Sequence, residues 1–104
     1  MSLIKHFVNG KLFEGVSKRT SKVFNPATGE ETAKVKLASK ADVDLVVEKA
    51  KKSFIDWSNK PAVIRARILF KFKELIEKDS DNLTKLIVSE HGKVYEDAKG
   101  SLTR

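Results

Sequence analysis

The spacing of apolar residues changes once along this chain, and that change constrains the fold more than any other feature. From Thr32 to Leu37 apolar residues alternate with lysines, a period of two that is typical of a strand with one buried face. After Ser39 the apolar residues recur every three or four positions, which is the period of an amphipathic helix. We therefore expect a strand-rich stretch over 1–37 and a helical stretch over 39–104.

Turn signals divide the first stretch. Asn9-Gly10 separates two short apolar runs and predicts a hairpin, because both turn residues of the favoured hairpin type must accept a positive φ. A second extended piece, around residues 22–24, runs into a turn at residues 25–29. Pro26 fixes φ in this turn, and Gly29 permits a left-handed exit. Met1-Ser2-Leu3 carries no prediction.

Capping signals divide the second stretch into helices. Ser39 and Asp42 have the spacing of a capping box and predict the start of the first helix. Asn59 is the expected cap of the second helix, with Pro61 in its first turn. The apolar stripes of these two helices are Val43, Val46, Val47, Ala50, Phe54 and Trp57, and Ile64, Ile68, Leu69, Phe72, Leu75 and Ile76.

A third and a fourth helix follow. The third begins at Asp79 or Ser80 and ends at Gly92, a residue suited to a left-handed C-terminal cap. We expect its inward side chains to be Leu83, Leu86 and Ile87. Tyr95, Ala98 and Leu102 mark the fourth helix, in which the given sequence ends.

Composition excludes several kinds of site. The 104 residues include no cysteine, so a disulfide, a thiolate metal site or a cysteine nucleophile is excluded within them. The two histidines, His6 and His91, lack the spacing of metal ligands, and we expect no metal site. The glycines match neither nucleotide-binding fingerprint. No apolar run approaches the ~20 residues of a membrane span, so we expect a cytoplasmic chain with no membrane partner.

Three further features have a structural and a functional interpretation. The net charge of +7 is spread along the chain, which favours solvated helix faces over specific nucleic-acid binding. Phe54, Trp57 and Phe72 could stack on bases, but at helical spacing they are expected to be core residues. Arg65 and Arg67 could bind phosphate, yet such a pair more often forms the wet edge of an amphipathic helix.

Six motifs, taken in order, resemble the aldehyde dehydrogenase superfamily. They are the hairpin at residues 6–11, the turn FNPATGE at 24–30, the helix at 50–57, the stretch RARILFKF at 65–72, EHGK at 90–93, and DAKG at 97–100 with Arg104 four residues later. The resemblance covers nearly all of the chain from His6 onward. RARILFKF and EHGK resemble the methylmalonate-semialdehyde branch in particular. In one departure, Ser101 stands where the family usually has an acid.

The resemblance implies that the chain is the N-terminal part of a larger α/β aldehyde dehydrogenase fold and not a complete domain. This part is an α+β segment, with a hairpin and strands followed by about four helices. Such enzymes oxidise an aldehyde through a cysteine thiohemiacetal, pass hydride to NAD and form a thioester. In this branch CoA then takes the acyl group, with loss of carbon dioxide. Because that machinery follows Arg104 in the family, we expect the chain alone to be inactive and to need neither NAD nor CoA.

The resemblance assigns one functional residue. Arg104 matches the arginine that faces the substrate carboxylate in this branch, and a guanidinium fork pairs well with a carboxylate. The alternative is an exposed last residue without a function. No catalytic, cofactor-binding or metal-binding residue is assigned. The expected partners are other copies of the chain and the remainder of the parent enzyme. A stand-alone helical interaction or assembly module is the alternative function.

Overall fold

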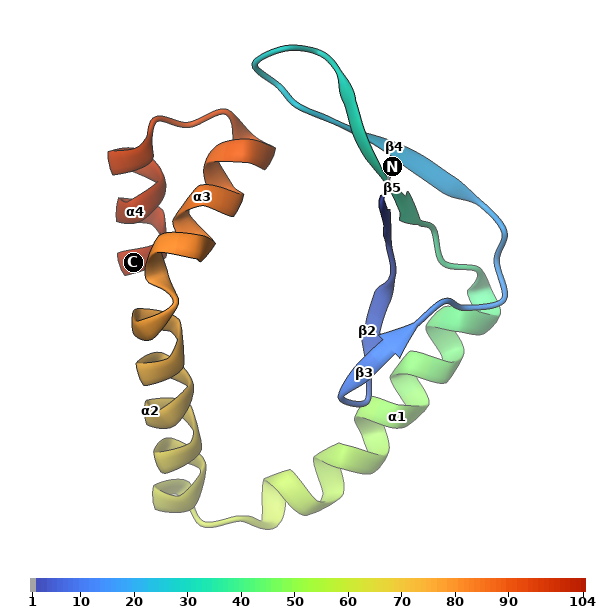
Figure 1. The fold of residues 1–104 in the computed structure, drawn as a ribbon. Coiled ribbons are helices and arrows are strands. Elements are labelled where there is room, and N and C mark those ends of the chain that lie inside the picture. The colour runs from blue at the N-terminus through green and yellow to red at the C-terminus, as the bar shows by residue number, and fades with distance from the viewer. Residues whose placement is uncertain (1) are drawn as a thin grey trace. The chain divides into compact units, whose positions relative to one another are not determined.

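The computed structural model describes residues 2–104 as two compact units. One unit combines the residues up to Val23 with Glu31–Lys60, and the other combines Phe24–Glu30 with Pro61–Arg104. The first contains strands and the first helix, and the second contains the remaining helices (Figure 1). The units therefore mix the strand-rich and helical stretches instead of separating them.

A hairpin in the first unit confirms the prediction made from Asn9-Gly10. Strands β2 (His6–Val8) and β3 (Lys11–Phe13) pair in antiparallel fashion, with Phe7 opposite Leu12. Asn9 has φ 53° and Gly10 has φ 78°, so both turn residues take the left-handed conformation that a two-residue hairpin of this type requires.

A three-stranded sheet completes the extended part of the chain. Its order is β1 (Ser2–Ile4), β5 (Glu31–Lys36) and β4 (Thr20–Phe24). Strand β1 pairs in parallel with β5, and Leu3 lies opposite Lys34. This pairing was not expected, because residues 2–4 carry no strand signal of their own. Ala33, in the centre of β5, is one of the few buried apolar residues.

Helix α1 (Lys40–Asn59) begins with the predicted capping box. The side chain of Ser39 accepts a hydrogen bond from the backbone N–H of Asp42, and the Asp42 side chain accepts one from the backbone N–H of Ser39. The Asp42 carboxylate also accepts hydrogen bonds from the backbone N–H groups of Val16 and Ser17. One side chain therefore caps the helix and holds the connection between β3 and β4 against it.

The start of helix α2 (Ala62–Lys78) differs from the prediction. Asn59 is the last residue of α1 and caps nothing, while Pro61 is the N-cap of α2 rather than part of its first turn. Pro61 explains the break, because a proline disfavours the helical conformation of the residue before it. Lys60 accordingly has φ −69° and ψ 136°, which is extended.

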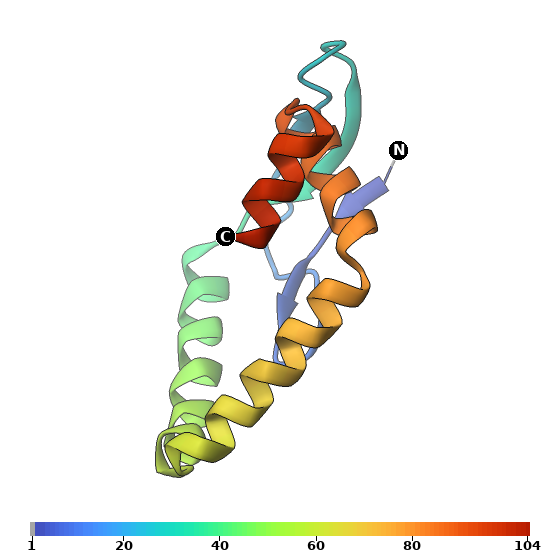
Figure 2. The same cartoon turned by 90° about the vertical axis from the view of Figure 1, so that its left-hand side faces the viewer.

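Helices α3 (Ser80–His91) and α4 (Tyr95–Thr103) form a packed pair and lie side by side in both views (Figures 1 and 2). Gly92 ends α3 with φ 76°, as predicted. Thr84 of α3 and Ala98 of α4 are fully buried, and because both side chains are small they permit a close approach of the helices. The prediction that Leu86 points inward is wrong, because the packed face of α3 is centred on Thr84 and Leu86 is 57% exposed.

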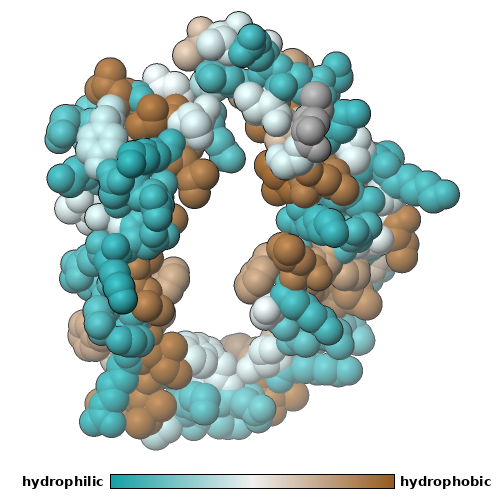
Figure 3. Space-filling model, viewed as in Figure 1, coloured by the Kyte–Doolittle hydropathy of each residue, from teal (hydrophilic) through white to brown (hydrophobic). Residues whose placement is uncertain are grey.

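The apolar stripes of α1 and α2 lie largely open to solvent. The expectation that Phe54 and Phe72 are core residues is wrong in this chain, since they are 65% and 59% exposed, and Trp57 is half-buried. Figure 3 shows the apolar surface over α1 and along α2. The helical period predicted the stripes correctly, but most of their side chains are exposed in the part of the chain that the structure describes.

Candidate functional site

Arg104, the residue assigned by resemblance, lies at the C-terminal end of α4. Its backbone N–H donates to the carbonyl oxygen of Gly100 at 3.2 Å. The guanidinium turns back along the helix, where Nη2 donates to Oγ of Ser101 at 3.4 Å. The side chain is exposed and takes part in no ion pair recorded among residues 2–104. Four of its five N–H donors are therefore open to a further acceptor.

A second cation contacts the same hydroxyl group. Nζ of Lys93, in the link between α3 and α4, donates to Oγ of Ser101 at 3.0 Å. The Ser101 hydroxyl donates its own proton to the carbonyl oxygen of Asp97 at 3.2 Å. Lys93 is half-buried. The structure thus brings two positively charged groups onto one neutral oxygen, at the end of α4 where Arg104 is exposed.

A pocket of about 390 Å³ lies next to this end of α4. Arg104, Thr103 and Leu102 contribute its α4 side, and Ile76 and Ser80 contribute the side formed by α2 and the start of α3. Its rim also carries Lys73 and Glu77, which form an ion pair with each other across one turn of α2. Since that pair is internally neutral, Arg104 supplies the net positive charge of the pocket.

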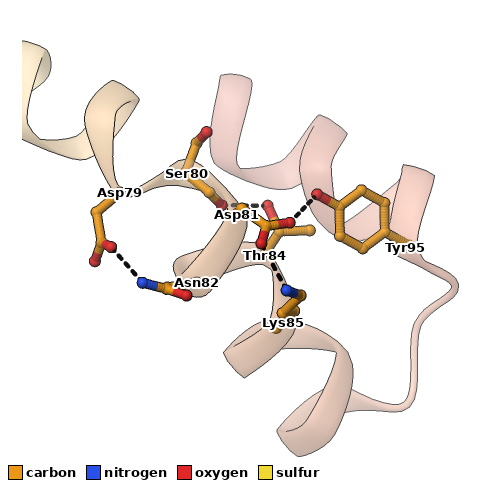
Figure 4. Close-up of polar contacts among 7 residues, drawn as sticks. All are labelled: Asp79, Ser80, Asp81, Asn82, Thr84, Lys85 and Tyr95. Carbon is orange, nitrogen blue, oxygen red and sulfur yellow. Dashed lines mark hydrogen bonds and ion pairs between the residues drawn. The ribbon is translucent and has the colours of Figure 1, made fainter.

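Helix α4 is held in place by polar contacts with the start of α3 (Figure 4). The hydroxyl of Tyr95 donates to Oδ1 of Asp81 at 2.7 Å, and Nζ of Lys85 lies 2.6 Å from Oδ2 of the same carboxylate. The hydrogen bond from Lys85, followed by that from Tyr95, holds the pKa of Asp81 below its ordinary value. The hydrogen bond to Asp81 raises the pKa of Tyr95 above its ordinary value.

Sequence reasoning missed most of this arrangement. Asp81 and Lys85 have the i, i+4 spacing of a helical ion pair, so their contact could have been predicted from the sequence. Tyr95 joins them from 14 residues away, and Lys93 meets Ser101 across eight residues that include a helix start, so neither contact follows from a local pattern. His91 sits in the last turn of α3, at the place expected for a cation near a helix C-terminus.

Comparisons with known proteins agree with this fold. Residues 13–104 match the model of the aldehyde dehydrogenase family. Malonate-semialdehyde dehydrogenase 3 of Geobacillus kaustophilus (strain HTA426) is 43% identical over 101 residues, which are 97% of this chain and 21% of that protein. Malonate-semialdehyde dehydrogenase of Bacillus pumilus (strain SAFR-032) is 38% identical over all of this chain and 21% of its own length.

Solved structures show the same architecture. The crystal structure of methylmalonate-semialdehyde dehydrogenase from Oceanimonas doudoroffii superposes with a TM-score of 0.94 at 43% identity, over 99% of this chain and 21% of that one. An NAD-dependent benzaldehyde dehydrogenase from Corynebacterium glutamicum gives a TM-score of 0.88 at 34% identity, over 95% of this chain and 22% of that one. The fold is therefore shared by enzymes that are named for different aldehydes.

The chain spans about a fifth of the length of the relatives it matches, 21% for both malonate-semialdehyde dehydrogenases. Among residues 2–104, no helix combines the length and the apolar character that crossing a membrane requires. The predicted order of hairpin, strands and four helices is confirmed, and so is the resemblance on which the expected fold rested. The match to the family model over residues 13–104 shows that this chain belongs to the aldehyde dehydrogenase family.

Proposed function

We propose that these residues form the N-terminal segment of an NAD-dependent, CoA-acylating (methyl)malonate-semialdehyde dehydrogenase. In this proposal the parent enzyme oxidises the semialdehyde to an acyl-CoA with loss of carbon dioxide. The observation that carries it is the identity of 43% with a malonate-semialdehyde dehydrogenase over 97% of this chain. The chain's 21% share of that relative supports a longer parent that contributes the catalytic residues.

Arg104 is the proposed contact to the substrate carboxylate. In the substrate class named by the relatives one carbon separates a carboxylate from the aldehyde, and a planar guanidinium binds a carboxylate through two parallel hydrogen bonds. The open donors of Arg104 and the adjoining pocket on α4 support this role. An uncharged aldehyde would gain nothing from the same contact.

NAD and CoA belong to the proposal only as cofactors of the parent. The five glycines of this chain do not form a phosphate-binding loop, and its residues contain no thiol that could carry a thioester. The residues described do not fit either cofactor, so no step of the chemistry is assigned to them. Their part is to contribute one side of the substrate pocket through α4.

The test compares two aldehydes in the enzyme that contains this segment. We expect NAD reduction with malonate semialdehyde, dependent on CoA for release of the acyl product. Replacing Arg104 by Met should raise KM for malonate semialdehyde by roughly 30-fold or more, equivalent to about 2 kcal/mol of lost binding, and should change KM for propanal little. Arg67→Met removes an arginine of α2 that is also exposed and is the matched control. If Arg104→Met raises KM equally for both aldehydes, Arg104 does not bind the substrate carboxylate.

The exposed apolar stripes support a second proposal, self-association of the isolated chain. Several large side chains of these stripes are more than half exposed, including Phe54, Leu69, Phe72 and Leu75. Leaving several hundred Å² of apolar surface uncovered costs on the order of 5–10 kcal/mol at ~25 cal/mol per Å², comparable to the stability of a whole domain. In the parent enzyme the same surface would meet the remaining chain, in a cytoplasmic homo-oligomer.

Sedimentation of the 104-residue chain at micromolar concentration tests this second proposal. We expect dimers or larger species, and Phe72→Glu, on a stripe side chain that is 59% exposed, should shift the chain toward monomer. A matched control, Lys71→Glu, changes charge at the neighbouring exposed position of α2 without removing apolar surface. A chain that stays monomeric as its concentration is raised would contradict self-association. It would instead support a compact module that is stable without burying the apolar stripes.

A further inference from the structure

The cluster formed by Lys93, Ser101 and Arg104 contains more positive charge than its own contacts neutralise. Lys93 and Arg104 reach Oγ of Ser101 at 3.0 Å and 3.4 Å, and neither takes part in an ion pair recorded among residues 2–104. Two like charges that share one neutral acceptor repel each other. A bound anion would remove that repulsion, so the cluster is arranged to favour one.

The Ser101 hydroxyl fixes the geometry of the two cations. A hydroxyl has one proton to donate and two lone pairs to accept with. Ser101 donates its proton to the carbonyl oxygen of Asp97, one turn earlier in α4, so both lone pairs are left for Lys93 and Arg104. All three hydrogen-bonding positions of the hydroxyl are therefore used, and the two cations are held next to one another.

Burial distinguishes Lys93 from the other lysines nearby. It lies half-buried in the short link between α3 and α4, whereas Lys99 of the same region is exposed. A partly desolvated ammonium interacts more strongly with an anion than a fully hydrated one does. With one N–H used by Ser101, Lys93 keeps two donors for a second acceptor.

We propose that Lys93 is a specificity-determining residue of the carboxylate subsite, acting with Arg104 through the hydroxyl of Ser101. This inference rests on the proposed function and deepens it: the subsite is a pair of cations rather than one arginine. Lys93 positions the Arg104 guanidinium through their shared acceptor and adds a second positive charge for the substrate carboxylate. The subsite therefore selects aldehydes that carry a carboxylate over uncharged aldehydes of similar length.

Steady-state kinetics of the complete enzyme with malonate semialdehyde and propanal test the inference. We expect Lys93→Met to raise KM for malonate semialdehyde by roughly 10-fold with kcat unchanged within twofold, since uniform binding is lost. The KM for propanal should change by less than twofold, and Lys93→Arg should restore most of the affinity for the semialdehyde. Lys99→Met, which removes a lysine charge from an exposed position of α4, is the matched control.

Ser101 supplies a second, independent variant. Ser101→Glu places a carboxylate between the two cations, so it should raise KM for malonate semialdehyde at least as much as Lys93→Met does. Ser101→Ala removes only the shared acceptor and should have a smaller effect in the same direction. Loss of activity toward both aldehydes in Lys93→Met, without rescue by Lys93→Arg, would overturn the inference in favour of a structural role.

Arg104→Met separates this inference from the proposed function. If Arg104→Met changes the preference between the two aldehydes and Lys93→Met does not, the proposed function stands and the role of Lys93 is overturned. If malonate semialdehyde is not turned over at all, the proposed function fails. Calorimetric titration of the enzyme with malonate then tests the role of Lys93 in anion binding. Binding weakened about 10-fold by Lys93→Met would support this role, and equal binding by both enzymes would overturn it.

Discussion

Each unit contains a polar cluster organised around one side chain. The two clusters differ in whether the charged groups in them are neutralised by hydrogen bonds and ion pairs within the chain. In the first unit the Asp42 carboxylate, 3% exposed, accepts hydrogen bonds from the backbone N–H groups of Val16, Ser17 and Ser39 and from the Ser39 hydroxyl. In the second unit the Ser101 hydroxyl accepts from two cations that form no recorded ion pair with any carboxylate of residues 2–104.

The difference separates a structural cluster from a binding cluster. A buried carboxylate whose donors are all supplied by its own chain has no capacity left for a ligand, so its contribution is to stability. Two cations on a neutral acceptor keep several donors and an uncompensated charge, so their remaining interaction energy is available to an anion. We therefore expect substitutions in the first cluster to change unfolding and substitutions in the second to change substrate preference.

The largest effect on stability is expected at Asp42. Asp42→Ala removes the helix cap and leaves the N–H groups of Val16 and Ser17 without their acceptor. The melting temperature, followed by circular dichroism at a fixed chain concentration, should fall by roughly 10–20 °C. Asp44→Ala is the control, because Asp44 lies in the same turn of α1 and makes only an exposed ion pair with Lys40. Similar losses for both variants would contradict the special position of Asp42.

The next largest effect is expected at Gly15. Its φ is +72°, and an added Cβ would lie 2.8 Å from Oδ1 of Asp42, closer than such contacts allow. Gly15→Ala should therefore lower the free energy of unfolding by about 2 kcal/mol or more. Gly10→Ala has nearly the same backbone penalty, with φ +78°, but its Cβ would meet nothing within 4 Å. The difference between the two variants, measured by urea unfolding, isolates the contact with Asp42.

Acid should weaken the first unit through the same carboxylate. The backbone hydrogen bond from Ser39, followed by that from its hydroxyl and that from Val16, holds the pKa of Asp42 well below its ordinary value of 3.8. A group whose pKa is lowered on folding contributes stability that is complete above the unfolded value and is lost as pH falls below it. The melting temperature should therefore drop below about pH 4, and Asp42→Asn should flatten that part of the profile. If Asp42→Asn has the same dependence of melting temperature on pH as the unmodified chain, the acid sensitivity does not come from Asp42.

The smallest effect is expected in the contact that holds α4. Tyr95→Phe removes the hydrogen bond to Asp81 but keeps the ring, and should lower the free energy of unfolding by about 0.5–1 kcal/mol. Amide hydrogen exchange in residues 95–98 should report the loss. If Tyr95→Phe also raises KM for malonate semialdehyde in the complete enzyme, structural and binding contacts within the second unit are less separate than proposed, because the position of α4 then controls substrate binding.

Local signals predicted much of the fold. The hairpin at Asn9-Gly10, the capping box of Ser39 and Asp42, and the end of α3 at Gly92 each depend on residues within a few positions of one another, and all three are confirmed. The start of α2 was placed wrongly because Asn59 is a good cap by type. Hydrogen bonding within α1 extends to that residue, and Pro61 then stops the helix.

The sequence by itself determined the order of strands and helices, because periodicity, caps and turn residues act over one or two turns of chain. It also indicated Arg104 through resemblance. Tertiary structure alone decided the parallel pairing of β1 with β5, the contact between Asp42 and residues 16–17, and the meeting of Lys93 with Arg104 on Ser101. The physical reason is that each of these contacts joins segments whose approach depends on the packing of whole elements, for which no short sequence pattern is sufficient.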